Sequence, residues 1–417
     1  FKYCIMFFIA KRIYASGEAG SVSASAVRIA TTGVAVGIMV MIISLCVTIG
    51  FQREIKSRIA SLIGHVQVLN SQSLYRTYTA PIQITDSLVN EIEALPSVSN
   101  VHRFVLCPGM LKTKEAFLGL LFRGVDASSF DASFLADNLV SGHVPAFADG
   151  SIPNDSILIS ATTASALQVA AGDRVYAYFF DSKLRARRFV VSGIFASNMA
   201  DFDYKMCYTS IHTAQSLNRW QYDQFSGAEV RLADFSLVDY ISNEISRILP
   251  QREDAYGQYY ASARVDELFP QIFSWLTLLD TNVVAILVLM ICVAGVTMIS
   301  GLLIIILERT RFIGVMKAMG STDKQLRSIF LHLSAMLVVR GLVIGNAAAL
   351  MLLAVQKWTG IISLDPTSYY LSHVPVHFNW FGILALNVVT FTVCVMSLVV
   401  PTLVISRISP AKSIRFE

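Results

Sequence analysis

The chain has 417 residues, of which 54% are hydrophobic and 15% charged, and its formal net charge is +4. The mean hydropathy of +0.57 is moderate for a membrane protein, because four dense apolar segments are averaged with one long polar segment. The isoelectric point of about 8.7 would suit nucleic-acid binding. However, residues 53–280 hold more acidic than basic side chains, so the basic excess lies at the ends and in short loops. We therefore expect no nucleic-acid partner.

Four segments are long and apolar enough to cross a bilayer as helices. A spanning helix needs roughly 20 apolar residues, because each residue advances it by about 1.5 Å. The segments are Ile29–Gln52, Thr281–Leu307, Ser328–Gln356 and Trp380–Ile405. The third segment carries Arg340, which either snorkels toward the outer headgroups, pairs within a bundle or lines a polar cavity.

Basic residues in the short flanks predict the orientation, since basic loops stay cytoplasmic. They are frequent before the first span, between spans two and three and after the fourth, whereas residues 357–380 contain only Lys357. Both termini are therefore predicted inside, and residues 53–280 outside. Residues 3–10 are apolar but too short to span, which favours a helix in the inner interface over a cleaved signal peptide.

The outer segment alternates short apolar strands with helices, which predicts an α+β domain of two lobes. The stretch Leu139–Asn154, rich in Gly, Pro and Asp, is the predicted boundary between the lobes. No spaced catalytic or metal-binding motif occurs, so we expect no catalytic residue and no metal. Cys107 and Cys207 are the candidates for one disulfide, and the bonded and free states both stay open. The expected strands are His65–Leu69, Val98–Val105, Phe117–Arg123, Ser156–Ser160, Val175–Phe180, Phe189–Phe195, Met206–Thr209 and Ala228–Leu232.

One predicted hairpin in this domain is unusually basic. Tyr176–Phe180 and Arg185–Val191 are expected to pair across a turn at Asp181–Leu184. The charge suits either a sheet edge protected against aggregation or a docking site for a partner. The residues of the docking interpretation are Phe180, Lys183, Arg185, Arg187 and Arg188.

Two helices are expected to extend beyond the bilayer. The helical pattern is unbroken over Gln271–Glu308, about 57 Å, against a hydrocarbon core of roughly 30 Å. The first span continues through Arg53–Leu62 as a second stalk. Gly33-x-x-x-Gly37 and Gly341-x-x-x-Gly345 predict close helix contacts, most simply within the chain's own bundle.

The loop after the second span contains a short predicted helix, Thr310–Met319. Gly320 ends it, and Ser321 is the expected N-cap of the next helix. Its apolar residues cannot all face solvent, so either the bilayer interface or a protein partner must cover them. These residues are Phe312, Ile313, Val315, Met316 and Met319.

This loop resembles the coupling region of FtsX/MacB-type ABC transporter permeases, whose pattern is approximately E-x-x-x-x-I-G-x-x-K/R-A-x-G-A/S. The matching residues, which the resemblance assigns to ATPase coupling, are Glu308, Ile313, Gly314, Lys317, Ala318, Gly320 and Ser321. The segments FIAKRIYAS, GVAVGIMVMIISLCVTIGF and PQIFSWLTLLDTNVVAILVLM and the ending ISPAKSIRFE are most similar to the lipoprotein-releasing (Lol) C/E-type permeases. The resemblance implies a MacB-like permease fold, with four transmembrane helices and a large extracytoplasmic α+β domain inserted between helices 1 and 2.

The function implied by the resemblance is that of a non-catalytic permease subunit. ATP hydrolysed by a separate cytoplasmic ABC ATPase would drive lipoprotein release from the inner membrane of a Gram-negative bacterium toward a periplasmic carrier. A second permease, either an identical copy or a paralogue, and membrane lipid are the other implied partners. The chain lacks GxxxxGK[ST], so ATP and Mg²⁺ are expected on the ATPase and no cofactor on this chain. The alternatives are a MacB-like efflux permease and an FtsX-like regulator of a cell-wall hydrolase.

In the lipoprotein-releasing branch, the lipid anchor enters between the outer halves of spans one and two. The residues carried over to this groove are Ile42, Leu45, Ile49, Phe51, Val283, Ile286 and Leu287. The basic hairpin is shorter than the family's carrier-binding hook and lacks its proline.

The sequence thus predicts nine segments. They are an interfacial helix (1–25), span one (26–52), the periplasmic two-lobed domain with stalks (53–270), stalk and span two (271–308), the coupling helix (309–327), span three (328–356), a short periplasmic loop (357–379), span four (380–406) and a cytoplasmic tail (407–417).

Overall fold

The computed structural model describes residues 22–74, 80–114, 116–126, 130–145, 155–180, 184–197, 199–249, 253–365 and 369–402. The chain forms two compact units. The helical unit contains residues up to 52, 275–362 and those from 374 onward, and the sheet unit contains 53–274 and 363–373. The predicted tail at 407–417 and most of the predicted interfacial helix at 1–25 lie outside the described residues.

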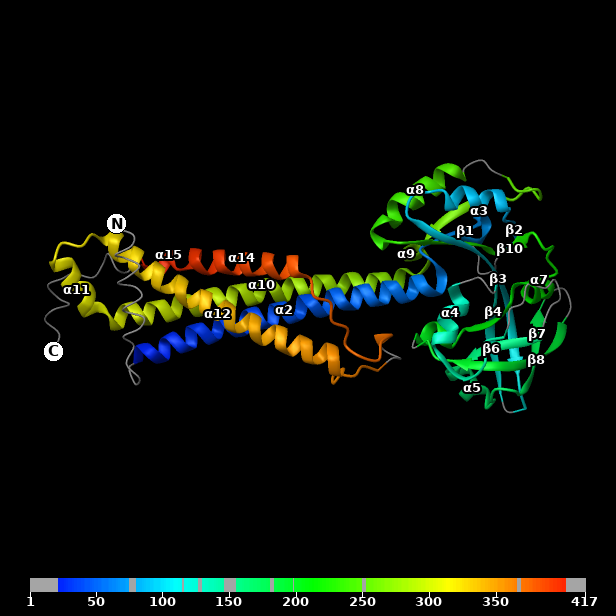
Figure 1. The fold of residues 1–417 in the computed structure, drawn as a ribbon, viewed down its shortest axis with the longest axis horizontal. Helices are drawn as coiled ribbons and strands as arrows, with labels where there is room; N and C mark the ends of the chain where they lie inside the picture. Colours follow the sequence, from blue (N-terminus) through cyan, green and yellow to red (C-terminus); the bar gives the residue numbers. More distant parts are fainter. Residues whose placement is uncertain are drawn as a thin grey trace. The chain divides into compact units, whose positions relative to one another are not determined.

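Among the described residues, four helices are long and apolar enough to cross a membrane (Figure 1). They are α2 (Val22–Ile63), α10 (Pro270–Glu308), α12 (Asp323–Thr359) and α14 (Trp380–Ser397). The short helices α11 (Thr310–Ala318) and α15 (Val399–Thr402) accompany them. The predicted unbroken helix over Gln271–Glu308 is confirmed, and α2 also continues through the predicted second stalk.

Glycines allow α2 to approach both of its long neighbours closely. A Cβ on Gly345 of α12 would lie 2.1 Å from Cγ2 of Ile38 and 2.4 Å from the carbonyl oxygen of Ala35. A Cβ on Gly33 of α2 would lie 2.5 Å from Cγ2 of Thr297 in α10. Helix α2 therefore contacts α12 and α10 with different faces. The interpretation of both glycine motifs as packing within the bundle is confirmed.

Apolar clusters and polar contacts such as an asparagine pair hold the helices together. One cluster joins α10, α11 and α12 through Ile305, Ile313 and Phe330. Between α12 and α14, the amides of Asn346 and Asn387 exchange hydrogen bonds of 2.7 and 3.0 Å. Such a reciprocal pair satisfies both amides where no water is present. A second cluster includes Ile38, Met41, Ile42, Cys46, Ala349, Leu353, Ile383 and Leu386.

A network of ten hydrogen-bonded strands forms the sheet unit. It contains β1 (Val66–Asn70), β3 (Val98–Lys112), β4 (Phe117–Val125), β5 (Leu139–Gly142), β6 (Ser156–Ser160), β7 (Arg174–Phe180), β8 (Leu184–Phe195), β9 (Met206–Ser210), β11 (Gly227–Leu232) and β12 (Tyr260–Arg264). A separate pair is formed by β2 (Ile82–Gln83) and β10 (Gln224–Phe225). The eight predicted strands are therefore confirmed, with differences at their ends.

The first lobe is an antiparallel sheet in the order β12-β1-β11-β3. Helices α3 (Asp86–Glu93) and α8 (Val238–Ile248) pack on it through apolar residues that recur one helical turn apart. These include Leu88 and Ile92 from α3 and Ile241 and Ile245 from α8. Figure 1 shows both helices beside β1 and β3.

The second lobe is a closed barrel, because β3-β4-β9-β6-β8-β7 pairs back onto β3. Three aromatic rings contact one another in its interior: Phe122 lies 5.0 Å from Phe179 and 5.7 Å from Phe189 between ring centroids. Aliphatic side chains such as Leu111 and Ile159 fill the rest. Strand β5 extends the barrel sheet from β8. Three short helices of this lobe are α4 (Phe130–Asp137), α5 (Ala161–Leu167) and α7 (Ile211–Asn218). A further short helix, α6 (Ala200–Asp203), precedes β9.

The predicted lobe boundary at Leu139–Asn154 is wrong. Leu139–Gly142 forms β5 within the second lobe, and 146–154 lies outside the described residues. The actual junction is the unbroken strand β3, whose first half pairs with β11 and whose second half pairs with β4 and β7. Loops rich in glycine and proline occur within lobes as well as between them, so composition alone misplaced the boundary.

Cys107 and Cys207 are buried free thiols in the barrel interior. Burial raises the pKa of Cys107 to about 12 and raises that of Cys207 as well. Both side chains act as small apolar packing residues.

Neighbouring strands of the first lobe anchor both stalk helices. Helix α2 leads through His65 into β1, and β12 leads through α9 (Val265–Leu268) into α10. Strands β1 and β12 pair along their whole length. The N–H of Val265 donates to the carbonyl of His65 at 3.1 Å, which extends this ladder to the helix ends. We call this junction, residues 60–70 and 260–272, the stalk root.

The imidazole of His65 is expected to make the stalk root sensitive to acid. Burial, followed by the charge of Arg231, lowers the pKa of His65 to about 4, and Nδ1 accepts the N–H of Leu232 at 3.2 Å. In the unfolded chain the pKa is near 6.5, so the folded state binds fewer protons between these values. Its free energy of unfolding should therefore fall as the pH drops from about 6.5 to about 4, by up to about 3 kcal/mol.

Thermal unfolding of the purified chain by circular dichroism tests this expectation. The unfolding temperature should fall more in the wild type than in His65→Gln between about pH 7 and pH 4.5, because glutamine keeps an acceptor without titrating. Equal losses in both proteins would contradict a role for His65.

Candidate functional site

Helix α11 ends in a local motif that sets the turn toward α12. The N–H of Gly320 donates to the carbonyl of Lys317 and that of Ser321 to the carbonyl of Met316, both at 3.0 Å. Gly320 has φ +92°, in the left-handed region where a side chain is strained. The expected helix-ending role of Gly320 is confirmed. The predicted N-cap Ser321 is wrong, because Thr322 caps α12 through a capping box with Gln325.

One side of α11 faces the helical bundle. Ile313 is fully buried in the cluster of α10 and α12, and Gly314 is buried beside it. The ammonium of Lys317 lies 2.9 Å from the carboxylate of Asp323 in the first turn of α12, and its side chain is only 11% exposed. These three predicted coupling residues therefore fix α11 to the bundle.

The opposite side of α11 presents exposed apolar side chains. Val315 is 43% and Met319 is 70% exposed, and both lie one turn apart in line with exposed Arg311. We call Arg311, Val315, Ala318 and Met319 the coupling stripe. Arg311, Val315 and Met319 are not residues of the sequence motif. The number of apolar residues in the loop, Val315 and Met319 among them, had nevertheless predicted that the bilayer interface or a protein partner covers the loop. Of the other motif residues, Glu308 ends α10 exposed, Gly320 is exposed and Ser321 is half-buried.

The predicted lipid groove residues lie in the helical unit at different depths. Ile42 is fully buried between α2, α12 and α14, and Leu45 and Leu287 pack against the same cluster. Phe51 is buried and its ring meets that of Trp275 at 6.4 Å. Ile49 and Val283 are half-buried, and Ile286 is 37% exposed. Three of the seven predicted residues, from both α2 and α10, thus share one apolar cluster, and the role of the seven as a lipid groove stays a prediction.

The predicted hairpin pairing of β7 and β8 is confirmed, with Phe180 opposite Leu184. Strand β7 also pairs with β3 and closes the barrel, whereas Leu184–Phe189 of β8 pair only with β7 among the described strands, so the interpretation as a charge-protected sheet edge stays a prediction. Arg185 donates to the carbonyl of Leu217 at 2.5 Å, and Arg187 binds Asp155 at 2.9 Å. Phe180 and Arg188 are exposed, whereas Lys183 lies outside the described residues.

Within the described residues, no group of three or more His, Cys, Asp and Glu side chains is placed to hold a metal ion. The features that characterise the chain are its long apolar helices, the exposed stripe on the short helix α11, and a two-lobed domain into which two of the long helices continue. These features define a membrane protein of the kind that carries a large domain between its first and second spans.

Family models match both parts of the chain. The MacB-like periplasmic core domain model matches residues 29–248, and the FtsX-like permease C-terminal model matches residues 283–410. The chain belongs to the family of FtsX/MacB-type permeases.

Relatives of known name match nearly the whole chain. The lipoprotein-releasing system transmembrane protein LolE of Haemophilus influenzae is 21% identical over 97% of this chain and 98% of its own length. LolC of Xylella fastidiosa is 22% identical over 92% of both chains. Among solved structures, the periplasmic region of MacB from Actinobacillus actinomycetemcomitans is 13% identical, covers 51% of this chain and 95% of its own, and has a TM-score of 0.35.

Proposed function

We propose that this chain is the permease subunit of an ABC system that releases lipoproteins from the inner membrane toward a periplasmic carrier. The observation that carries the proposal is the match over 97% of this chain to a lipoprotein-releasing transmembrane protein. The stalk helices and the coupling stripe support it, because long helices that continue into the sheet unit and an exposed apolar stripe on α11 are what a permease driven by a separate ATPase would need. In this proposal the chain itself catalyses no reaction.

The proposed partner at the coupling stripe is a separate cytoplasmic ABC ATPase, which binds ATP and Mg²⁺. The exposed Val315 and Met319 are apolar anchors of the kind that a protein pocket buries. A push on α11 would pass to the bundle through buried Ile313 and through the Lys317–Asp323 ion pair. A second permease, identical or paralogous, would complete the assembly.

The proposed orientation places both termini in the cytoplasm and the sheet unit in the periplasm of a Gram-negative bacterium. At the other end of α12 from the coupling helix, exposed Trp358 lies near the helix end, and Trp380 and Phe381 begin α14. Exposed aromatic residues at helix ends favour the membrane interface. The basic residues of the 309–327 segment favour the cytoplasmic side of the opposite interface.

The proposed path of the lipid anchor follows the predicted residues of α2 and α10. Acyl chains gain about 0.8 kcal/mol for each buried CH₂ group, so they require an apolar surface. Leu45 and Leu287 already share an apolar cluster, and Ile286 is exposed beside it. Separation of α10 from α2 would open this surface to a lipid.

Reconstitution tests the function directly. The chain is co-purified with its ATPase and any second permease, placed in proteoliposomes with a triacylated lipoprotein, and ATP-dependent release is measured. The double variant Val315→Asp with Met319→Asp should lower release by roughly tenfold or more, since loss of interface anchors costs ~1.4 kcal/mol or more. The matched control is Val140→Asp, at an exposed valine of the sheet unit.

The outcomes separate the candidate functions. If the double variant still releases lipoprotein at the wild-type rate, the proposed role of the coupling stripe in binding the ATPase is contradicted. No release by the wild type would contradict the proposed function. In that case, export of a soluble substrate would indicate an efflux permease, and ATP-dependent activation of a bound cell-wall hydrolase would indicate an FtsX-like regulator.

A further inference from the structure

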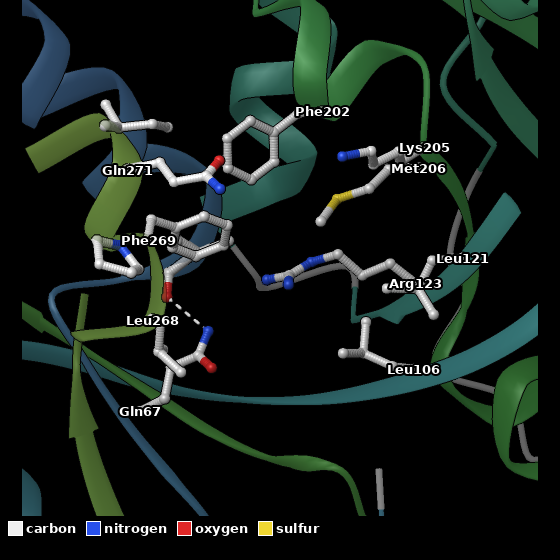
Figure 2. Close-up of a pocket in the computed structure, with 13 residues that line it drawn as sticks. Gln67, Leu106, Leu121, Arg123, Phe202, Lys205, Met206, Leu268, Phe269 and Gln271 are labelled. Carbon is white, nitrogen blue, oxygen red and sulfur yellow. Dashed lines mark hydrogen bonds between the residues drawn. The ribbon is translucent and has the colours of Figure 1, made fainter. Parts of the chain in front are cut away.

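A cavity of about 500 Å³ lies inside the sheet unit, between the barrel and the stalk root (Figure 2). On the barrel side, side chains alternate along each strand: Phe122 and Cys207 point into the barrel core. Their neighbours Leu121, Arg123 and Met206 point the other way and line the cavity. The strand period of the barrel thus creates an outward face, which Phe202 of the short helix α6 borders at the cavity.

The opposite wall is made by the stalk root. Ile63 is the last residue of α2, and Leu268, Phe269 and Ile272 lie where α9 leads into α10. The ring of Phe269 meets that of Phe202 from the barrel lobe at 5.3 Å between centroids. The lining is therefore predominantly apolar, and its size is within the range of small-molecule sites.

The charged groups of the lining are all cationic. The guanidinium of Arg123 is 2% exposed and binds the carboxylate of Glu229 at 2.6 Å, which neutralises it. The amide of Gln67 donates to the same carboxylate at 3.0 Å. Lys205 is exposed at the cavity rim and has no hydrogen bond or ion pair from its ammonium to another described residue. Figure 2 shows the Lys205 amine and the Arg123 guanidinium on the same side of the cavity, opposite Phe269.

We propose that this cavity binds a single-chain amphiphile with an anionic head group, such as a fatty acid. The acyl chain would lie against Ile63, Phe202, Met206 and Phe269, and the head group would meet Lys205 at the rim. An anionic head group would be attracted to that ammonium, whereas a neutral ligand would gain no such attraction and a cationic one would be repelled. Because one wall belongs to the barrel and the other to the stalk root, the ligand ties the barrel to the roots of both stalks.

Photolabelling of the full chain in phosphatidylcholine nanodiscs tests this proposal. The probe is palmitate bearing a diazirine, and mass spectrometry locates the labelled peptides. We expect label on the peptides containing Phe202–Met206 and Leu268–Ile272, and excess unlabelled palmitate should compete for it. The uncharged competitor hexadecanol should compete less well.

Lys205→Glu should lower this labelling roughly fivefold, because the ion pair between Lys205 and the head group is lost. An exposed ion pair contributes about 1 kcal/mol, which corresponds to that fold-change. Lys112→Glu, the same change at an exposed barrel lysine outside the cavity lining, should leave it unchanged. Label confined to the membrane-spanning segments would overturn the cavity as a lipid site. Equal labelling of Lys205→Glu and wild type would contradict the preference for an anionic head group. Competition by hexadecanol equal to that by palmitate would contradict it as well. The labelling does not depend on lipoprotein release, so the two proposals fail separately.

Discussion

Gly345→Ala is expected to lower the stability of the helical unit strongly. The added Cβ would lie 2.1 Å from Cγ2 of Ile38 and 2.4 Å from the carbonyl oxygen of Ala35. The carbonyl belongs to the α2 backbone and cannot rotate away, so α2 and α12 must separate. Overpacking of this kind costs about 1–3 kcal/mol or more.

A thiol-reactive reagent measures this effect during heating when mass spectrometry locates the labelled cysteines. Cys46 and Cys394 are fully buried in the helical unit and react only when it opens, whereas Cys292 is exposed from the start and Cys107 and Cys207 report on the sheet unit. The matched control is Gly295→Ala on α10. Its Cβ would have its nearest neighbour, Oγ of Ser397, at 3.8 Å, an ordinary contact. The unfolding temperature should fall for Gly345→Ala and change little for Gly295→Ala. The same shift in both variants would show that helix propensity, rather than close approach, determines the cost.

Arg123→Met is expected to destabilise the sheet unit by about 3–5 kcal/mol, because the buried carboxylate of Glu229 would lose its guanidinium partner. The two side chains are 2% and 9% exposed and lie 2.6 Å apart. Gln67 adds one hydrogen bond to the carboxylate, which does not replace the lost cation. The pair joins β4 of the barrel to β11 of the first lobe, so its loss should weaken the contact between lobes.

Hydrogen exchange of the amides in β4 and β11 measures this loss in the purified chain. The double variant Arg123→Met with Glu229→Gln should recover much of the stability, because no buried charge remains. The control is Arg247→Met, at an ion pair with Glu244 where the arginine is 76% exposed, and it should change exchange little. A double variant as unstable as the sum of the two single changes would contradict the charge argument.

The long helices and most strands were predictable from the sequence because their apolar residues recur at a regular period. Gln271–Glu308 has no charge or proline to interrupt it after Asp280, and the structure forms one helix there. Strand β12 was missed because Tyr260–Arg264 lacks apolar alternation. The lobe boundary was missed because β3 passes from one lobe to the other without a break in its pattern.

The position of the candidate site in the sequence was predictable, but which of its side chains are exposed was not. The loop at 308–321 was found through its motif, yet the motif contains both bundle-facing and exposed residues. A helix as short as α11, with apolar residues on most sides, does not reveal which side is buried until α10 and α12 are packed. The Arg123–Glu229 ion pair could not be predicted from the sequence either, because 106 residues separate its partners and only the fold brings them together.

The ladder between β1 and β12 limits how the two stalks can move. To slide one stalk along the other, the protein would have to break the paired backbone hydrogen bonds between β1 and β12 at the stalk root together. The β1–β12 ladder therefore joins the C-terminal end of α2 to the N-terminal end of α10, so that neither helix end can shift along the other without the loss of backbone hydrogen bonds.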